Sequence, residues 1–358
     1  MAGPLRTLVV GCGHMGVSHA RAYHGMPDAF TIVGLVSRGD SRSRLNADLG
    51  GGCAEYADFH VALAQAKPDV VCISTYTETH AGYAIAAMEA GAHVFVEKPL
   101  AATVADAEAV VATARRLDRA LVVGYILGVH PAWMAFTAMA RELGTPLVLR
   151  MNLNQQSAGA HWDTHRLLLR DTSPIVDCGV HYVDVMCQMT GARPVAVSGI
   201  SARLSGDLAP GQVNYGHLQV TFDDGSVGWY EAGWGPMMSE TAYFVKDVIG
   251  PRGSVSIVAR ETAGDGASAD IGGHTRVDVI RRHHAETGAD GRFARPDEIV
   301  AIDDAPGHDE LCRREQLLLL DAIHGRLDLS AHWQRACDSL RIVLAADESA
   351  RTHRTVAL

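Results

Sequence analysis

The sequence has no run of 18 consecutive apolar residues, although 47% of its 358 residues are hydrophobic. A helix that crosses a bilayer needs about 20 mostly apolar residues, so we expect no membrane-spanning segment and no membrane partner. The N-terminal residues also have neither an apolar secretory core nor a twin-arginine stretch. These absences predict a soluble, cytoplasmic protein.

Clustered positive charge is also missing. Lysine and arginine total 31 against 41 aspartates and glutamates, which gives a formal net charge of -10. Proteins that bind nucleic acid carry a basic patch or stripe that neutralises phosphates. No such stripe is present, so we expect no nucleic-acid partner.

Paired cysteines are absent as well. The seven cysteines are odd in number and form no C-x-x-C pair. Disulfide frameworks and zinc sites require cysteines or histidines at suitable spacings. Because most of these cysteines lie in apolar runs, we predict buried free thiols and no metal site.

The chain does contain a glycine-rich turn near its start. The apolar run LRTLVV, residues 5–10, leads into GCGHMG, residues 11–16, and then into a helical pattern over 15–26. In a G-x-G-x-x-G turn the glycines allow a tight bend, close approach of a pyrophosphate, and packing of helix on strand. The pyrophosphate lies at the helix N-terminus. The predicted coenzyme contacts here are Gly11, Gly13, His14, Met15 and Gly16. Since glycine is common in this chain, a plain glycine turn is the alternative.

Strand-like and helical segments alternate up to about residue 145. The predicted strands are 5–10, 31–36, 69–75, 92–96 and 120–125. Such alternation is typical of a doubly wound parallel sheet, which binds ligands at the carboxyl ends of its strands. We therefore predict an α/β Rossmann dinucleotide-binding domain over residues 1–125.

After about residue 146 strand-like segments follow one another. The predicted strands are 148–154, 195–204, 217–222, 226–234, 241–249 and 254–258, with a hairpin signal in DDG at 223–225. Helices are predicted at 174–189, 309–324 and 330–352, and a loop at 263–273. This pattern indicates an α+β domain over 126–335 with a mostly antiparallel, open-faced sheet. A C-terminal helix and tail, 336–358, is expected to pack back on the first domain.

The choice of coenzyme depends on the end of the second predicted strand. NAD-binding folds place an acidic residue about 20 positions beyond the glycines, but this strand ends in Ser37 and Arg38, with Arg42 nearby. A hydroxyl and guanidinium groups suit a 2′-phosphate. We therefore favour NADP(H). NAD(H) remains an alternative because Asp40 could reach the ribose.

Further polar residues follow the predicted strands. Glu97 and Lys98 end the strand AHVFV, and Thr75 and His80 follow the strand before it. All four are predicted coenzyme contacts at the carboxyl edge of the sheet. Lys98 could also hydrogen-bond a reacting oxygen, the alternative being a surface lysine. His80 is expected either to touch the nicotinamide end or to cap the next helix.

An acid–base cluster is predicted in SPIVDCGVHYVDVMCQMTG. Asp177, His181 and Asp184 are four and three residues apart, so they share one face of a helix. Histidine suits proton transfer near neutral pH, and a carboxylate can orient its ring. With 18 histidines in the chain, chance spacing is the alternative.

The chain resembles the glucose–fructose oxidoreductase, inositol dehydrogenase and rhizopine-catabolism (Gfo/Idh/MocA) family. The resemblance rests on GCGHMG, STYTETH, GAHVFVEKPLA, DCGVHYVD and SLRIVLAADESA. It implies a dinucleotide-binding domain joined to an open-faced sheet domain, with sugars or cyclitols bound between them. It also implies that Lys98, Asp177 and His181 are catalytic, with His181 moving the hydroxyl proton.

Two local departures from the family pattern stand out. Thr75, Tyr76 and Thr77 occupy the place where many members have Thr-Pro-Asn, so the local shape near the coenzyme is open to question. Gly128 occupies the place of a common arginine, whose contacts must be lost or supplied elsewhere.

These observations predict a NAD(P)-dependent oxidoreductase that acts on a secondary hydroxyl or keto group of a sugar, cyclitol or related polyol. Relatives of this fold also include redox-neutral glycosidases that use NAD transiently, and dinucleotide-sensing regulators that catalyse nothing. Both stay open as alternatives. The regulator is less favoured, because such a protein has no need for Lys98, Asp177 and His181 together.

Substrate contacts and assembly follow from the second domain. The candidate substrate contacts are Asn152, Asn154, Trp162 and His165, which could equally be surface residues of the sheet. An open sheet face needs cover, so we expect a homodimer or homotetramer formed through it. The residues expected on that face are Val220, Phe222, Trp229 and Tyr230.

Overall fold

The computed structural model describes residues 3–239, 245–258, 277, 279–302 and 306–358. The predicted loop at 263–273 and the first part of the predicted strand 241–249 lie outside these residues. The chain divides into two compact units, and each is described by itself. The first comprises 1–129 and 306–337, the second 130–305 and 338–358.

The first unit is a parallel sheet of six strands in the order β3-β2-β1-β4-β5-β6. The strands are β1 (Leu5–Val10), β2 (Phe30–Val36), β3 (Ala54–Tyr56), β4 (Val70–Ile73), β5 (His93–Val96) and β6 (Leu121–Val123). The predicted doubly wound Rossmann sheet is confirmed. The order reverses between β1 and β4, and a ligand crevice is expected at their carboxyl ends.

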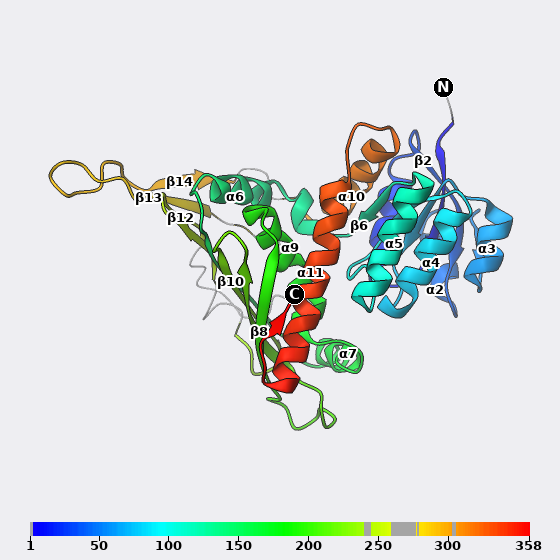
Figure 1. Ribbon diagram of the computed structural model, residues 1–358. Coiled ribbons are helices and arrows are strands. Elements are labelled where there is room, and N and C mark those ends of the chain that lie inside the picture. The colour runs from blue at the N-terminus through cyan, green and yellow to red at the C-terminus, as the bar shows by residue number, and fades with distance from the viewer. Residues whose placement is uncertain (1–2, 240–244, 259–276, 278, 303–305) are drawn as a thin grey trace. The chain divides into compact units, whose positions relative to one another are not determined.

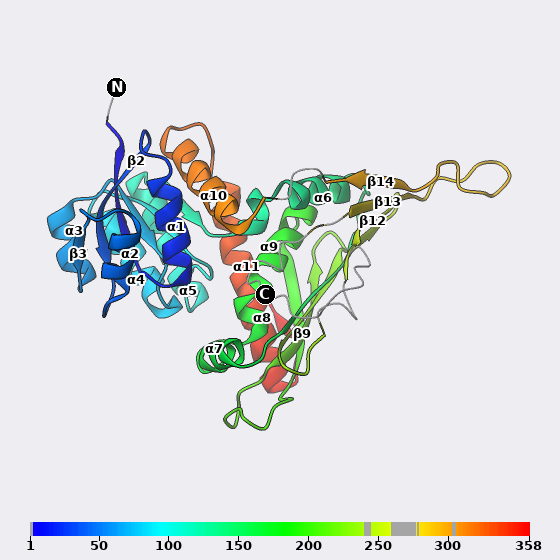
Figure 2. The same ribbon diagram turned by 180° about the vertical axis from the view of Figure 1, so that it is seen from behind.

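Helices cover this sheet on both sides. They are α1 (His14–His24), α2 (Ser41–Asp48), α3 (Phe59–Ala66), α4 (Thr77–Glu89), α5 (Val104–Leu117) and α10 (His308–Ile323), with a short 3-10 turn, η1 (Ile126–Val129). Figure 1 shows α4 and α5 over one face of the sheet, and Figure 2 shows α1 over the other. Covered on both faces, the central strands are continuous apolar runs, as in the fully buried VVCI of β4.

The second unit contains a sheet of nine strands in the order β14-β13-β12-β11-β7-β10-β9-β8-β15. The strands are β7 (Val148–Gln156), β8 (Pro194–Ala202), β9 (Tyr215–Phe222), β10 (Val227–Gly235), β11 (Lys246–Gly250), β12 (Gly253–Val258), β13 (Val279–His284), β14 (Glu298–Ala301) and β15 (Val356–Ala357). Among the strand pairs described for this sheet, only β7–β10 is parallel. The mostly antiparallel sheet is confirmed, as is the hairpin at 223–225, which joins β9 to β10.

The helices of the second unit are α6 (Pro131–Arg141), α7 (Ala160–Leu168), α8 (Pro174–Asp177) and α9 (Gly179–Thr190). The helix α11 (Ser330–Thr352) begins in the first unit and ends in the second. None of the described helices is long and apolar enough to cross a lipid bilayer. All seven cysteines are free, and all but Cys53 are buried, as predicted.

The residues expected on the open sheet face were mostly misplaced. Val220, Phe222 and Tyr230 are buried, and the ring of Tyr230 stacks on that of Tyr182 in α9 at 4.8 Å. Side chains alternate between the faces of a strand, so Trp229 and its neighbour Tyr230 cannot share one. Val220 faces Gly228, two residues before Tyr230, and therefore shares its helix-covered face. Of the four, Trp229 alone points to the other side.

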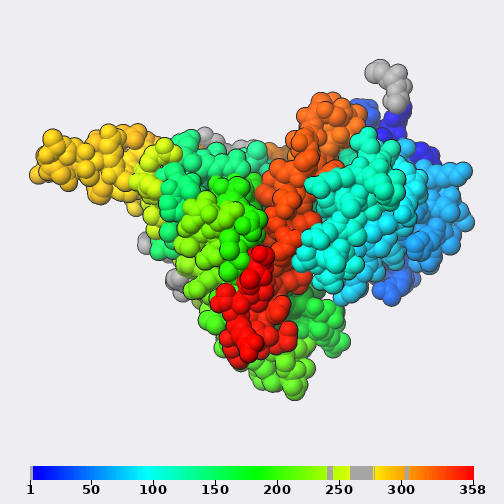
Figure 3. Space-filling view, in the orientation of Figure 1, coloured from blue at the N-terminus to red at the C-terminus, as the bar shows by residue number. Residues whose placement is uncertain are grey.

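The hairpin of β13 and β14 continues beyond these two strands, with an isolated bridge between Thr287 and Phe293. Residues 285–297 between the two strands are exposed. Figure 3 shows this segment, in yellow, reaching beyond the rest of the second unit. Phe293 in this segment is 62% exposed, and its ring centroid lies 4.6 Å from that of His283 in β13.

The domain boundaries differ from those expected. Residues 306–337, placed in the second domain and the tail, belong to the first unit because Leu319 and Leu329 join its hydrophobic core. The end of the chain, 338–358, belongs to the second unit, where β15 pairs with β8. Sequence order does not predict this arrangement, because the apolar residues of α10 pack on α1 and on the parallel sheet, which are far from it in sequence.

Candidate active site

The glycine turn after β1 has the geometry that dinucleotide binding requires. Gly11 has φ +92°, and a Cβ there would lie 2.2 Å from the carbonyl oxygen of Ser74. A Cβ on Gly16 would lie 1.8 Å from the carbonyl oxygen of Gly11. A Cβ on Gly13, the N-cap of α1, would meet nothing within 4 Å. The turn is thus closed at its first and third glycines and open at the second, where the pyrophosphate of a dinucleotide fits.

The other predicted residues of this turn begin α1. His14 and Met15 are its first two residues, at the positively polarised end of the helix. His14 is exposed, and its ring centroid lies 6.0 Å from that of His308 in α10. These positions are compatible with a bound pyrophosphate at the helix N-terminus.

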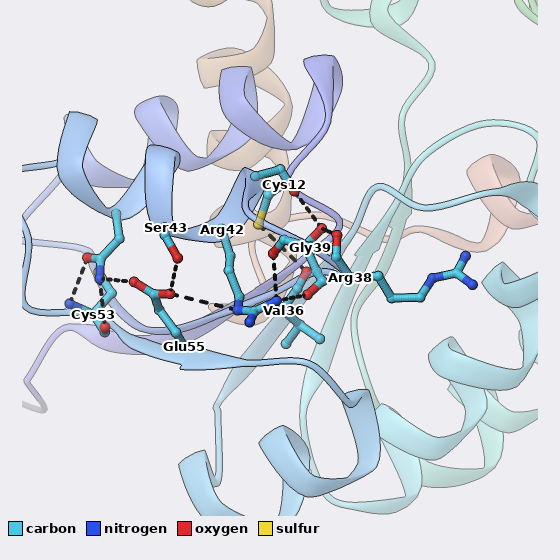
Figure 4. A network of polar contacts seen from close by, with 11 residues as sticks. Cys12, Val36, Arg38, Gly39, Arg42, Ser43, Cys53 and Glu55 are labelled. Carbon is cyan, nitrogen blue, oxygen red and sulfur yellow. Dashed lines mark hydrogen bonds and ion pairs between the residues drawn. The ribbon is translucent and has the colours of Figure 1, made fainter.

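The residues proposed for the 2′-phosphate of NADP(H) differ from one another in their contacts, as Figure 4 shows. Arg42 donates to the carbonyl oxygens of Ser37 and Gly39 and lies 3.7 Å from a carboxylate oxygen of Glu55. Ser37 and Ser41 share a hydrogen bond of 2.7 Å between their hydroxyls. Arg38 is exposed, and its side chain points away from this network. Arg42 therefore stabilises the loop after β2 through its hydrogen bonds. The guanidinium of Arg38, in contrast, is accessible to a ligand.

Thr75 and His80 follow β4. The hydroxyl of Thr75 lies 2.7 Å from that of Thr79, while the ring of His80 lies 3.0 Å from the carbonyl oxygen of Thr75 and 2.7 Å from that of Pro99. Burial lowers the pKa of His80 despite these two carbonyls. The neutral ring then donates across the shorter contact, to Pro99, so His80 joins the loop after β4 to the segment after β5. It does not cap α4, whose N-cap is Tyr76.

Glu97 and Lys98 stand at the carboxyl end of β5, as predicted. Glu97 is buried, and one of its carboxylate oxygens accepts a hydrogen bond of 2.7 Å from Nε2 of His19 in α1. Its other oxygen accepts the backbone N–H of Lys98 at 3.2 Å. Lys98 is half-buried. Since β5 neighbours β4, and β4 neighbours β1, this lysine belongs to the same sheet edge as Gly11.

His19 also lies near two potential metal ligands. Its ring, the thiol of Cys312 and the carboxyl of Glu315 place their donor atoms within 4.8 Å of one another. However, Nε2 of His19 already donates to Glu97, and Nδ1 lies 3.0 Å from the side-chain amide of Gln316. Both ring nitrogens of His19 are therefore engaged by Glu97 and Gln316, so neither faces a metal ion in this arrangement.

In the second unit, Asp177 and His181 lie where α8 meets α9. The single helix predicted over 174–189 is interrupted at Cys178, so that Asp177 ends α8 and His181 lies in the first turn of α9. Ser173 caps α8 and donates from its hydroxyl to Asp347 in α11 at 2.8 Å. His181 and Asp184 are both buried, and Asp184 accepts a hydrogen bond of 2.7 Å from Gln188.

His165 in α7 interacts with Asp177, which ends the next helix, α8. The ring of His165 stacks on Trp234 at 4.5 Å, and its Nδ1 lies 2.9 Å from the hydroxyl of Ser157. Burial lowers the pKa of His165 to about 4, and the charge of Asp177 opposes this shift. His165 is therefore an uncharged ring beside a carboxylate, which suits contact with a hydroxyl-rich molecule.

The other candidate substrate residues are engaged within the protein. Asn152 accepts the N–H of Val245 at 2.9 Å, and Asn154 donates to Glu231 at 3.3 Å. Trp162 is buried in a small apolar cluster with Trp234 and Leu208, and its indole N–H donates to Asp207. Each of the three thus has a partner within the protein, while the side-chain oxygen of Asn154 is buried without one, and a substrate contact stays a prediction for all three.

Sequence analysis missed Gln155. Its side-chain oxygen accepts hydrogen bonds from the indole N–H of Trp234 at 2.7 Å and from the thiol of Cys178 at 3.4 Å. Gln155 thus lies beside the junction that carries Asp177. The run of polar residues in NLNQQ gives no sign of this, because the register of the sheet decides which of them faces the helices.

Comparison with known proteins gives two matches to models of one family. The model described as "Oxidoreductase family, NAD-binding Rossmann fold" matches residues 5–125, and the "GFO/IDH/MocA C-terminal domain" matches residues 138–256. The chain is 30% identical to the UDP-N-acetylglucosamine 3-dehydrogenase of Acidithiobacillus ferrooxidans over 57% of this chain and 60% of that protein. It is 29% identical to the inositol 2-dehydrogenase of Klebsiella pneumoniae over 51% and 53% respectively. The alignments thus span little more than half the length of these relatives.

A solved structure shows the same fold over nearly the whole chain. An NAD-binding oxidoreductase from Klebsiella pneumoniae superposes with a TM-score of 0.78 and 20% identity, covering 99% of each chain.

Proposed function

This chain belongs to the Gfo/Idh/MocA family of oxidoreductases, and we propose that it moves a hydride between a nicotinamide coenzyme and a secondary hydroxyl or keto carbon of a sugar, cyclitol or related polyol. The proposal rests on where the structure puts one lysine, one aspartate and one histidine. Lys98 follows β5 at the carboxyl edge of the parallel sheet, and Asp177 and His181 stand where α8 meets α9. The names of the two relatives, a nucleotide-sugar dehydrogenase and an inositol dehydrogenase, support the substrate class.

In the proposed reaction each residue has a separate task. The bound coenzyme supplies the hydride acceptor or donor. In the direction of oxidation, His181 takes the proton of the reacting hydroxyl. The ammonium of Lys98 donates a hydrogen bond to the same oxygen and stabilises its negative charge as the C–H bond breaks. Asp177 accepts a hydrogen bond from a neighbouring hydroxyl, which favours polyols over simple alcohols.

A panel of substrates tests this proposal. Inositols, aldoses, anhydro sugars and their keto forms are offered with NAD(H) or NADP(H), and the ultraviolet absorbance of the reduced nicotinamide is followed. We expect at least one polyol to change that absorbance in proportion to turnover. A glycosidase would cleave glycosides without net change and retain its coenzyme, whereas a regulator would bind coenzyme and turn over no member of the panel.

We further propose that NADP(H) is the preferred coenzyme, with Arg38 and Ser37 at the 2′-phosphate. Replacing Arg38 with alanine is expected to raise KM for NADP⁺ by about 10–100-fold, because a charge-assisted hydrogen bond contributes roughly 1.5–3 kcal/mol. KM for NAD⁺ should change little.

Arg44→Ala is the matched control, since Arg44 is an exposed arginine of α2 in the same segment. This variant should leave both KM values unchanged. Equal losses with the two coenzymes in Arg38→Ala, or a wild-type preference for NAD⁺, would contradict the assignment.

A homodimer or homotetramer through the open sheet face remains a proposal. Val148, Val227 and Ile249 are exposed residues of adjacent strands, and Trp229 lies beside them with its ring stacked on His217. An apolar face of this kind suits burial against a second copy of the chain.

A further inference from the structure

A chain of buried hydrogen bonds in the first unit ends at Glu97. We call the four residues Tyr23, Gln316, His19 and Glu97 the Glu97 relay. The hydroxyl of Tyr23 donates to the side-chain oxygen of Gln316, whose amide nitrogen lies 3.0 Å from Nδ1 of His19. Nε2 of His19 then donates to Glu97 at 2.7 Å. Tyr23, His19 and Gln316 are fully buried, so water does not compete for these bonds.

The hydrogen bonds of the relay decide which nitrogen of His19 carries the proton that faces Glu97. With the Gln316 amide donating, Nδ1 of His19 is an acceptor and the ring proton lies on Nε2. If the amide were turned over, Nδ1 would also carry a proton, and the ring would be an imidazolium. In both arrangements Nε2 carries a proton directed at Glu97, because the ionised carboxylate can only accept. An ionised Glu97 therefore has a donor in either arrangement.

This donor lets Glu97 hold a buried negative charge. Burial raises the pKa of Glu97, but the hydrogen bond and charge of His19, followed by the charge of Lys98, bring that pKa below its usual value. The neighbouring carboxyl of Glu315 in α10 differs. Burial and the charge of Glu97 raise the pKa of Glu315 well above its usual value. Glu97 is thus ionised, and Glu315 is neutral.

Titratable groups from several described elements interact with Glu97. They are His19 of α1, Cys72 of β4, His80 of α4, Lys98 beside it, and His308, Cys312 and Glu315 of α10. Burial keeps both thiols protonated, because it raises their pKa values strongly, and it keeps His80 and His308 neutral by lowering theirs. The charge of Glu97 is therefore directed chiefly at His19 and Lys98.

We propose that Glu97, held by His19, is a positioning residue that keeps Lys98 in its ammonium form and fixes its backbone. One oxygen of Glu97 accepts from His19 and the other accepts the N–H of Lys98, so a single carboxylate ties the lysine to α1 and α10. The attraction is reciprocal: since Lys98 stabilises the charged form of Glu97, Glu97 must stabilise the charged form of Lys98. The catalytic part of this inference rests on the proposed function, whereas the charge state of Lys98 does not.

The scarcity of lysine makes a direct test possible. The chain contains three lysines, Lys67, Lys98 and Lys246. In the full-length protein with isotope-labelled lysine, proton–carbon correlation NMR gives one ε-methylene signal group for each, and a pH titration follows all three. Glu97→Gln keeps the size of the side chain and removes its charge. We expect the pKa of Lys98 to fall by about 1 pH unit or more in this variant, while that of Lys246, which belongs to the second unit, stays constant.

Glu315→Gln is the matched control. It makes the same change at an adjacent buried carboxyl that is already neutral, so the pKa of Lys98 should stay at its wild-type value. Glu97→Asp retains the charge at a greater distance and should lower that pKa less than Glu97→Gln does. If Glu97→Gln does not fold, a fall in Glu97→Asp with none in Glu315→Gln still supports the relay.

Two results would overturn the proposal. One is an unchanged pKa of Lys98 in folded Glu97→Gln or, if that variant does not fold, in Glu97→Asp. The other is an equal fall in Glu315→Gln. For any polyol that the enzyme oxidises, the pH profile of kcat/KM is measured as well. In Glu97→Gln its alkaline limb should move to lower pH by as many pH units as the NMR titration shows the pKa of Lys98 to fall. The NMR titration needs no substrate. Inactivity toward every polyol would therefore reject the proposed function, while the relay would still be tested by the pKa of Lys98 in the variants.

Discussion

Replacing His181 with alanine is expected to lower kcat by about 10²–10⁴-fold, which is the usual contribution of a general acid–base group. The side chain is buried in the first turn of α9, where it is proposed to take the hydroxyl proton as the hydride leaves. Without the imidazole, the alkoxide must form with no base in place. Steady-state kinetics with the best polyol of the panel measures the loss.

The affinity for coenzyme should stay nearly constant in the same variant. His181 belongs to the second unit, whereas the glycine turn belongs to the first, so titration of coenzyme fluorescence should give a Kd close to the wild-type value. His24→Ala, an exposed change at the end of α1, serves as the control and should leave kcat unchanged. Undiminished turnover in His181→Ala would remove this residue from the mechanism.

Replacing Lys98 with alanine is expected to lower kcat by about 10²–10³-fold. A preorganised donor aimed at an oxygen that gains negative charge typically contributes this much, because it acts more strongly on the transition state than on the bound alcohol. KM for the polyol should change much less than kcat. Measurements of kcat and KM over a range of polyol concentrations separate the two effects.

Lys67→Ala is the control for this prediction, because Lys67 is an exposed lysine in the same unit. It should leave kcat and both KM values unchanged. If Lys98→Ala instead raised KM for the coenzyme and left kcat intact, Lys98 would be a coenzyme-binding residue with no part in the chemical step.

Much of the first unit could be predicted because its determinants are local. The strand LRTLVV, the three glycines and the apolar run before Glu97 each act within about ten residues, and the parallel sheet follows from their alternation with helices. The structure adds the reason for each glycine, such as the approach of Gly16 to the carbonyl of Gly11. The roles of Lys98, Asp177 and His181 remain predictions.

The features that escaped prediction depend on contacts between distant parts of the sequence. His19 meets Gln316 across 297 positions and Glu97 across 78, so neither pairing leaves a periodic pattern. The face of Tyr230 depends on the register between β9 and β10, and a shift of one residue exchanges the two faces. The sequence predicts Arg42 as a ligand contact from its charge alone, because the ion pair with Glu55 and the bonds to the loop carbonyls depend on the fold.

The division of the coenzyme-binding unit into two stretches of chain has a consequence for engineering. Residues 1–129 lack α10, which supplies Gln316 to His19 and Leu319 to the core, so this fragment expressed alone would leave buried polar groups uncovered. A chimera that imports the nucleotide half of a relative must therefore carry two inserts and cross over inside α11. Swaps made at a single junction should yield insoluble protein.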